Sequence, residues 1–200
     1  MSYRSDSERT GSLGWRDPFG ASRPQLAELF ATWGGASFNS GLYRIHSSRT
    51  FEAASRAIET YLPKMHRTAV PFGFDWLGRN YAIAPGGGSS PVLIVDLGEG
   101  RVFEVPVDLE AFHDVELVDY PNEALAADWF SDWRSSHEGV ALCFSECVGY
   151  RTPIFLGGTD DDENLEVSDI DVYWSMTSQL YGKVKNLPEG TPIDGISIEE

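Results

Sequence analysis

The sequence predicts an α+β fold in which amphipathic helices flank a central, mainly antiparallel sheet. Apolar residues recur at helical spacing near both ends of the chain, and short β-type runs separated by glycine turns lie between them. With 42% apolar residues in 200, the chain is long enough to bury one substantial core. We expect a mobile arm over 1–22 and a single domain over 23–200, helical over 23–70 and with the sheet and further helices over 71–200.

A first helix is expected to begin at Pro24, which is tolerated in a first turn, and to stop at Gly34. Its core-facing side is predicted to consist of Leu26, Leu29, Phe30 and Trp33. A second helix is expected to begin with Thr50 as its cap and to end before Pro63. Its apolar face is predicted to consist of Phe51, Ala54, Ile58, Tyr61 and Leu62.

Three β-type runs follow, over 80–84, 92–97 and 101–107. The glycines at 98 and 100 predict a tight hairpin between the last two runs, and the Gly/Ser stretch 86–90 predicts a looser connection between the first two. The sequence therefore predicts an antiparallel meander.

Two more helices are expected in the acidic half. Asn122 would cap one that carries Leu125, Trp129 and Trp133 on one face. Ser168, with an aspartate three residues later, approximates a capping box and would open a helix ending at Gly182. The segment 152–156 reads as a strand.

Charge is very uneven along the chain. Residues 1–100 are nearly balanced, with 10 Lys and Arg against 9 Asp and Glu, whereas residues 101–200 carry 5 against 22. Such a surface repels nucleic-acid phosphates and anionic lipid, so neither is an expected partner. It accelerates encounter with basic proteins, although it also serves plain solubility. Only two cysteines, a polar start and no long apolar run indicate a protein of the reducing cytoplasm.

No arrangement of residues predicts catalysis. The chain has no G-x-S-x-G, its four histidines are scattered, and its glycine stretches lack the lysine and helix of a phosphate loop. Cys143 and Cys147 are read as packing residues in an apolar setting. We expect no catalytic residue, metal or cofactor, and a small hydrolase using Asp75, His113 or Cys147 is kept as the competing class.

The acidic run 160–163 partly follows the spacing of a calcium loop. Oxygen ligands would come from Asp160, Asp162 and Asn164, with Val167 and Asp171 further along. The sharp-turn glycine is replaced by Leu165, and the segment before the run does not predict a helix. An acidic loop that faces solvent or a partner is the preferred interpretation.

Four motifs in consistent order resemble the GAD-like/Tdi-type immunity proteins of bacteria, which are associated with type VI secretion systems and DNase toxins. They lie at 34–46, 72–79, 147–150 and 153–174, and the resemblance covers roughly 24–198. It implies that the shared motif residues are scaffold: Phe38, Asn39, Gly41, Tyr43, Asp75, Trp76, Gly78, Arg79, Gly157, Gly158, Asn164, Glu166, Tyr173 and Trp174.

The resemblance implies a non-enzymatic cytoplasmic protein that neutralises a cognate toxin, here expected to be a basic nuclease, by binding it. An adaptor similar to SMI1/KNR4-like modules, without a toxin, is the alternative, and the oligomeric state is left open. Because charge guides encounter with a basic partner, we expect contacts from two acidic stretches. The expected contact residues are Asp108, Glu110, Asp114, Glu116, Asp119, Asp160, Asp161, Asp162 and Glu163.

Overall fold

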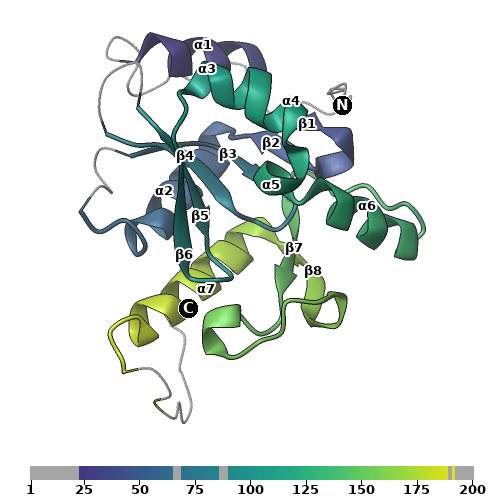
Figure 1. Cartoon of the computed structure of the whole chain (residues 1–200). Helices are drawn as coiled ribbons and strands as arrows, with labels where there is room; N and C mark the ends of the chain where they lie inside the picture. Colours follow the sequence, from purple (N-terminus) through teal and green to yellow (C-terminus); the bar gives the residue numbers. More distant parts are fainter. Residues whose placement is uncertain (1–22, 65–68, 86–89, 189–190, 192–200) are drawn as a thin grey trace.

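A computed structural model describes residues 23–64, 69–85, 90–188 and 191, and it has an α+β fold with helices on both sides of an antiparallel sheet (Figure 1). The sheet runs in the order β1-β2-β3-β4-β5-β6, and every neighbouring pair is antiparallel. Its strands are β1 Ser37–Phe38, β2 Tyr43–Ile45, β3 Val70–Asp75, β4 Asn80–Ile83, β5 Val92–Asp96 and β6 Arg101–Val105. A separate antiparallel hairpin pairs β7 Glu146–Tyr150 with β8 Leu165–Asp169.

The helices fall before, between and after these strands. The α-helices are α1 Pro24–Trp33, α2 Ser48–Glu59, α3 Leu109–Ala111, α4 Leu117–Asp119, α5 Pro121–Leu125, α6 Ala127–Ser136 and α7 Ile170–Val184. A π-helical turn, η2 Phe112–Glu116, joins α3 to α4, and short 3-10 turns form η1 Asn39–Gly41, η3 Ile154–Leu156 and η4 Asp162–Asn164. Within the described residues, no helix has both the length and the apolar character needed to cross a bilayer.

Strands β2 to β5 are buried on both faces, whereas the edge strand β6 is largely exposed. On β5, Val92 and Ile94 belong to a core shared with α1 and with α3 to α6, while Leu93 and Val95 belong to a core shared with α2 and α7. A β-bulge between Pro71 and Gly73 moves the pattern of β3 by one residue, so that successive aromatic residues of this strand enter opposite cores. Burial on both faces explains why β5 reads as a continuous apolar run.

The first predicted helix is confirmed over Pro24–Trp33, with Leu26 and Phe30 buried. The prediction that Trp33 faces the core is wrong, because 38% of its surface is exposed at the end of the helix. Gly34 follows as the residue after the helix, and its N–H still bonds the carbonyl of Phe30 at 2.9 Å.

The second predicted helix exists, but its cap was misplaced. Ser47 is the N-cap, and its hydroxyl accepts from the Thr50 N–H at 3.3 Å, while the Thr50 hydroxyl accepts from the Ser47 N–H at 2.9 Å. This reciprocal pair is a capping box in which threonine takes the place of the usual Glu or Gln. The helix ends at Glu59, ahead of Pro63, and not because of it.

All three predicted strands are confirmed with slightly shorter bounds, and the tight hairpin pairs Asp96 with Arg101. Strands β1, β2, β3, β7 and β8 were not predicted, and the first two lie within 23–70, where only helices were expected. The expected strand at 152–156 is wrong, because that segment holds the 3-10 turn η3. The expected arm over 1–22 and most of the connection 86–90 lie outside the described residues.

The helix predicted to follow Asn122 is two helices. Ala126 has a φ of +51°, which interrupts the helix between α5 and α6. The predicted cap is wrong, because Asn122 lies within α5, whose N-cap is Tyr120, and the N-cap of α6 is Ala126. The Asn122 Oδ1 instead accepts from the Asp128 N–H in the first turn of α6 at 2.8 Å. The last helix, α7, is capped by Asp169 in place of Ser168, and it continues past Gly182.

Candidate functional site

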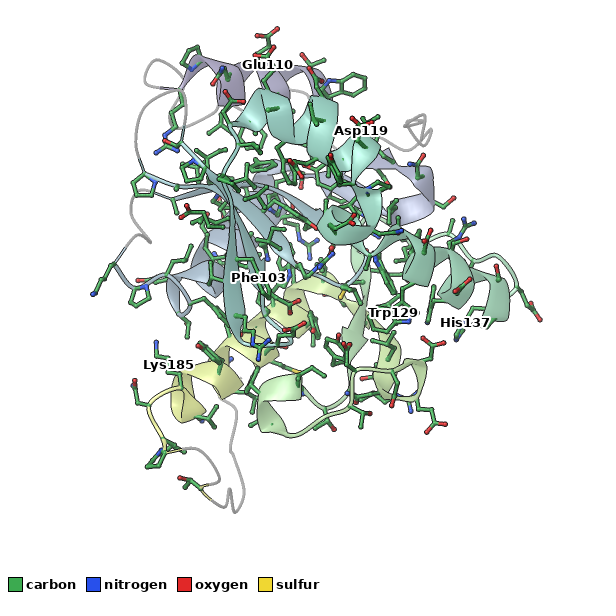
Figure 2. All side chains as sticks on the ribbon, viewed as in Figure 1. Phe103, Glu110, Asp119, Trp129, His137 and Lys185 are labelled. Atoms are coloured by element: carbon green, nitrogen blue, oxygen red, sulfur yellow. The ribbon has the colours of Figure 1, made fainter. Side chains whose placement is uncertain are left out.

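The acidic segment 108–119 forms α3, η2 and α4 along one edge of the molecule (Figure 1). Its inner side is buried through Leu109, Phe112 and Leu117. Of the predicted contact residues, Asp108 is the N-cap of α3 and accepts from the Ala111 N–H at 2.9 Å. The outer positions are Glu110, Asp114 and Asp119, which are exposed, and Glu116, which is half-buried; Figure 2 shows Glu110 and Asp119 at this outer edge.

A hollow of about 390 Å³ lies between this segment and α1. The acidic residues Glu110 and Asp114, four residues apart, line it on one side, and Glu28 lines it from α1. Its lining consists of Gln25, Glu28, Leu29, Thr32, Trp33, Leu109, Glu110, His113 and Asp114. The structure thus brings two of the predicted acidic residues to one concave surface.

A second hollow of about 290 Å³ shares Leu29, Trp33, His113 and Asp114 with the first. Its remaining lining consists of Phe38, Tyr43, Ile45 and Leu117. We call the two together the α1–α3 groove: an apolar floor from α1 and the first strands, with carboxylates along its rim. Sequence reasoning missed the contribution of α1, because the helical spacing of its apolar residues indicated only a core-facing side.

His113 lies in the groove in a neutral form. Its Nδ1 lies 2.8 Å from the Leu109 carbonyl, and therefore carries the proton. Its Nε2 accepts from the Tyr43 hydroxyl at 3.1 Å. Burial lowers the pKa of His113. This histidine therefore adds no positive charge to the floor at neutral pH.

The second predicted contact surface, the run 160–163, is exposed but internally bonded. Tyr150 donates to Asp160 at 2.6 Å, and the Trp129 indole donates to Asp162 at 2.6 Å. Asp161 caps η4 by accepting from the Asn164 N–H at 3.2 Å. Three of these four carboxylates therefore help to fold the β7–β8 connection.

The two acidic stretches do not form one surface. In Figure 2, Trp129, which bonds Asp162, lies well away from Glu110 on α3. Glu163 is exposed beside η4. Within the described part of the chain, no three or more His, Cys, Asp or Glu side chains gather in a way that could hold a metal ion, the residues of the calcium-like run included.

The turn 75–79, one of the family-like motifs, is organised around a buried carboxylate. Asp75 Oδ1 accepts from the N–H groups of Leu77 at 3.1 Å and Arg79 at 3.0 Å. Its Oδ2 accepts from Arg79 Nε at 2.6 Å and from the Tyr81 hydroxyl at 2.8 Å. Burial opposes the charged form of Arg79, but Asp75 raises the pKa of this guanidinium overall. The pair thus closes the turn between β3 and β4.

Two indoles attach other elements to this turn. Trp76 donates to the Leu125 carbonyl at 2.9 Å, and Trp174 on α7 donates to the Gly78 carbonyl at 2.8 Å. Gly78 has a φ of +77°, which favours glycine, and a Cβ there would meet the ring of Tyr173 at 3.0 Å. Tyr173 is buried. The turn therefore connects both cores.

The first family-like motif contains β1, η1 and β2, which form the edge of the sheet beside the 75–79 turn. Phe38 stacks on Tyr43 with ring centroids 6.3 Å apart, and Asn39 takes a positive φ of 53° in η1. Gly41 has a φ of +93°, and a Cβ there would lie 2.5 Å from the guanidinium of Arg44. These residues support one end of the groove floor, where Phe38 and Tyr43 also lie.

In the last motif, Asn164 joins the two ends of a loop. Its amide donates to the carbonyls of Thr152 and Thr159, both at 2.8 Å. Gly157 takes a φ of +88° after η3, and a Cβ at Gly158 would collide with the Thr152 carbonyl. Glu166 is exposed on β8 and forms a 3.4 Å ion pair with Arg151.

The three residues of the competing enzyme hypothesis lie in different settings. Asp75 has all its acceptor capacity engaged in the turn. Cys147 is fully buried on β7, and burial raises the pKa of its thiol. His113 is bonded at both nitrogens. A nucleophile and its base would have to be within hydrogen-bond reach, and the described contacts join no pair of these three.

Comparisons with known proteins identify a fold relative. No family model matches the chain, and no curated protein matches it. Among solved structures, the chain is similar to the crystal structure of Atu4351 from Agrobacterium tumefaciens. The two are 12% identical, with a TM-score of 0.52 over 80% of this chain and 77% of that one. At this identity the similarity concerns the fold alone.

Proposed function

We propose that this chain is an immunity protein that binds and neutralises a cognate bacterial toxin, with a basic nuclease as the first candidate. The observation that carries the proposal is the α1–α3 groove, where Glu28, Glu110 and Asp114 surround an apolar floor. Apolar anchors provide affinity at protein interfaces, and surrounding charges select and steer a partner of opposite sign. The large acidic excess of residues 101–200 favours the same class of partner.

The proposal includes the finer assignment to the GAD-like/Tdi-type immunity proteins and to a toxin of a type VI secretion system. Its support is the order of four sequence motifs, whose residues are mainly buried or bonded within the fold. The protein would act without turnover, in the cytoplasm of the cell that makes the toxin. It would not bind nucleic acid, because its acidic half repels phosphates.

Two modes of inhibition are consistent with this proposal. The carboxylates could occupy the DNA groove of the nuclease, or the protein could bind elsewhere and hold the toxin inactive. Both modes weaken with salt, because steering is electrostatic in each. Competition with a short DNA duplex separates them: occlusion predicts that the duplex and this protein exclude each other, whereas distal binding predicts a ternary complex.

The experiment is co-expression with the product of the adjacent gene, scored for growth and for recovery of a complex. We expect rescue, co-purification and a nuclease activity that falls in proportion to added protein until the two are equimolar. Lethality at good expression of both proteins, with no complex, would contradict the proposal for that pair. A complex without toxicity of the neighbour would instead favour an adaptor.

A further inference from the structure

We infer that the α1–α3 groove binds an amphipathic segment of a partner protein, which inserts aliphatic or aromatic side chains between α1 and η2 and places Lys or Arg on the carboxylate rim. The inference rests on the proposed function and specifies the chemistry of its partner. It is carried by the shape, the apolar floor and the charge of one surface.

The two hollows of the groove adjoin, because they share four lining residues, and their volumes of about 390 and 290 Å³ are comparable to those of small ligand pockets. Side chains from both α1 and η2 line it, so an inserted segment would contact two helical walls. Trp33 is the large apolar residue at this surface that remains 38% exposed. The exposed indole of Trp33, beside the apolar residues of the groove floor, resembles the aromatic anchors found at the centre of protein interfaces.

The acidic residues at the rim of the groove favour a partner with positively charged side chains. Glu28 faces the groove from α1, and Glu110 and Asp114 face it from α3 and η2. Among the described residues that line the groove, none is lysine or arginine, and His113 is neutral. A cationic side chain placed here would pair with these carboxylates, and a guanidinium could also lie over the Trp33 ring.

The chain itself offers a second occupant, the segment 1–22 that precedes α1. This segment contains Trp15 and Phe19, but it carries three arginines and three acidic residues. It has no net charge to complement the rim, whereas a basic toxin does. A partner segment therefore satisfies both properties of the groove.

The test uses a short helical peptide with leucines on one face and arginines on both flanks, titrated into the full-length, isotopically labelled protein. We expect shifts of the Trp33 indole signal and of amides in α1 and η2, identified with a Trp33→Phe variant. Glu110→Gln combined with Asp114→Asn should weaken binding by about tenfold. The matched control is Asp132→Asn with Glu138→Gln, which removes the same charge from exposed positions away from the groove.

Equal weakening in both double variants, shifts confined to other elements, or no binding would overturn the inference. A comparison of the unliganded wild-type protein with an unliganded Trp15→Ala/Phe19→Ala variant gives a further check. If these two substitutions shift the signals of the groove residues, the protein's own segment 1–22 occupies the groove, and the inference is overturned. The outcomes are separable from those of the proposed function. A toxin complex that tolerates the Glu110/Asp114 substitutions refutes the groove alone, whereas groove binding of the peptide without any toxin complex refutes the immunity role.

Discussion

Replacing Asp75 with alanine should destabilise the protein more than any surface substitution. The carboxylate is fully buried and accepts four hydrogen bonds, two of them from backbone N–H groups. Its partner Arg79 has a side chain that is only 13% exposed, so Asp75→Ala would leave a nearly buried cation without its counter-charge. Breaking a buried ion pair on one side costs about 3–5 kcal/mol, so we expect a loss of about 4 kcal/mol.

The free energy of unfolding, measured by urea denaturation, checks this value. The control is Glu166→Ala, which removes an ion pair whose side chains are 60% and 50% exposed and should cost less than about 1 kcal/mol. In a second comparison, Asp75→Ala with Arg79→Met should be more stable than Asp75→Ala alone, because the guanidinium left without Asp75 is removed as well. An Asp75→Ala loss no larger than that of Glu166→Ala would refute the reasoning.

Three further predictions concern buried groups. Burial raises the pKa of Asp96 from 3.8 to about 6, so ionisation of this carboxyl destabilises the fold progressively between these two pH values and fully above pH 6. Asp96→Asn should therefore stabilise by up to about 3 kcal/mol at pH 8, and urea unfolding at a series of pH values should show this gain disappear below about pH 4. Burial lowers the pKa of His46 to about 3, so the free energy of unfolding should fall as the pH drops below 6.5, because the unfolded chain then takes up a proton that the folded chain does not. The carbon chemical shifts of the imidazole should show a neutral ring at pH 5, and a protonated ring at that pH would contradict the prediction. Gly149→Ala places a Cβ against the ring of Tyr173 and should lower the free energy of unfolding, measured with urea, by about 1–3 kcal/mol. Gly182→Ala, within α7, meets only an ordinary contact and should raise the free energy of unfolding by about 0.5–1 kcal/mol. The opposite order of stability would contradict the packing argument.

Local patterns predicted the elements whose causes are local. Helix α1 follows its apolar spacing, and the β5–β6 hairpin follows its glycines. Strand β2 escaped prediction because part of what holds it is distant in sequence: it pairs with β3, which follows α2, and the guanidinium of its buried Arg44 bonds the carbonyl of Glu146. A positive φ at Ala126 interrupts a segment whose apolar spacing predicts one helix. The sequence gives no signal of this break, because alanine is not a residue that favours a positive φ.

Of the two sides of the groove, the sequence predicted the acidic side and not the side formed by α1. Charge identified Glu110 and Asp114, because a carboxylate cluster is visible in sequence. The α1 wall was not predicted, because Leu29 and Trp33 occupy the positions of a core-facing stripe, yet Leu29 is only partly buried, Trp33 is 38% exposed and both line the groove. Concavity of this kind depends on how two helices meet, and periodicity within one helix contains no information about it.

The net charge of −16 therefore combines two populations of carboxylates with different consequences. Asp75, Asp161 and Asp169 accept backbone N–H bonds at turns or caps, so the fold itself requires them. Glu110 and Glu163 are exposed, and neither caps a helix nor closes a turn with its carboxylate among the described residues. A substitution of the first population changes stability before it changes any interface, whereas the second can change without loss of the fold. The second population is therefore the one to vary in a search for the partner, and in the groove Glu110 lies beside apolar residues of α1.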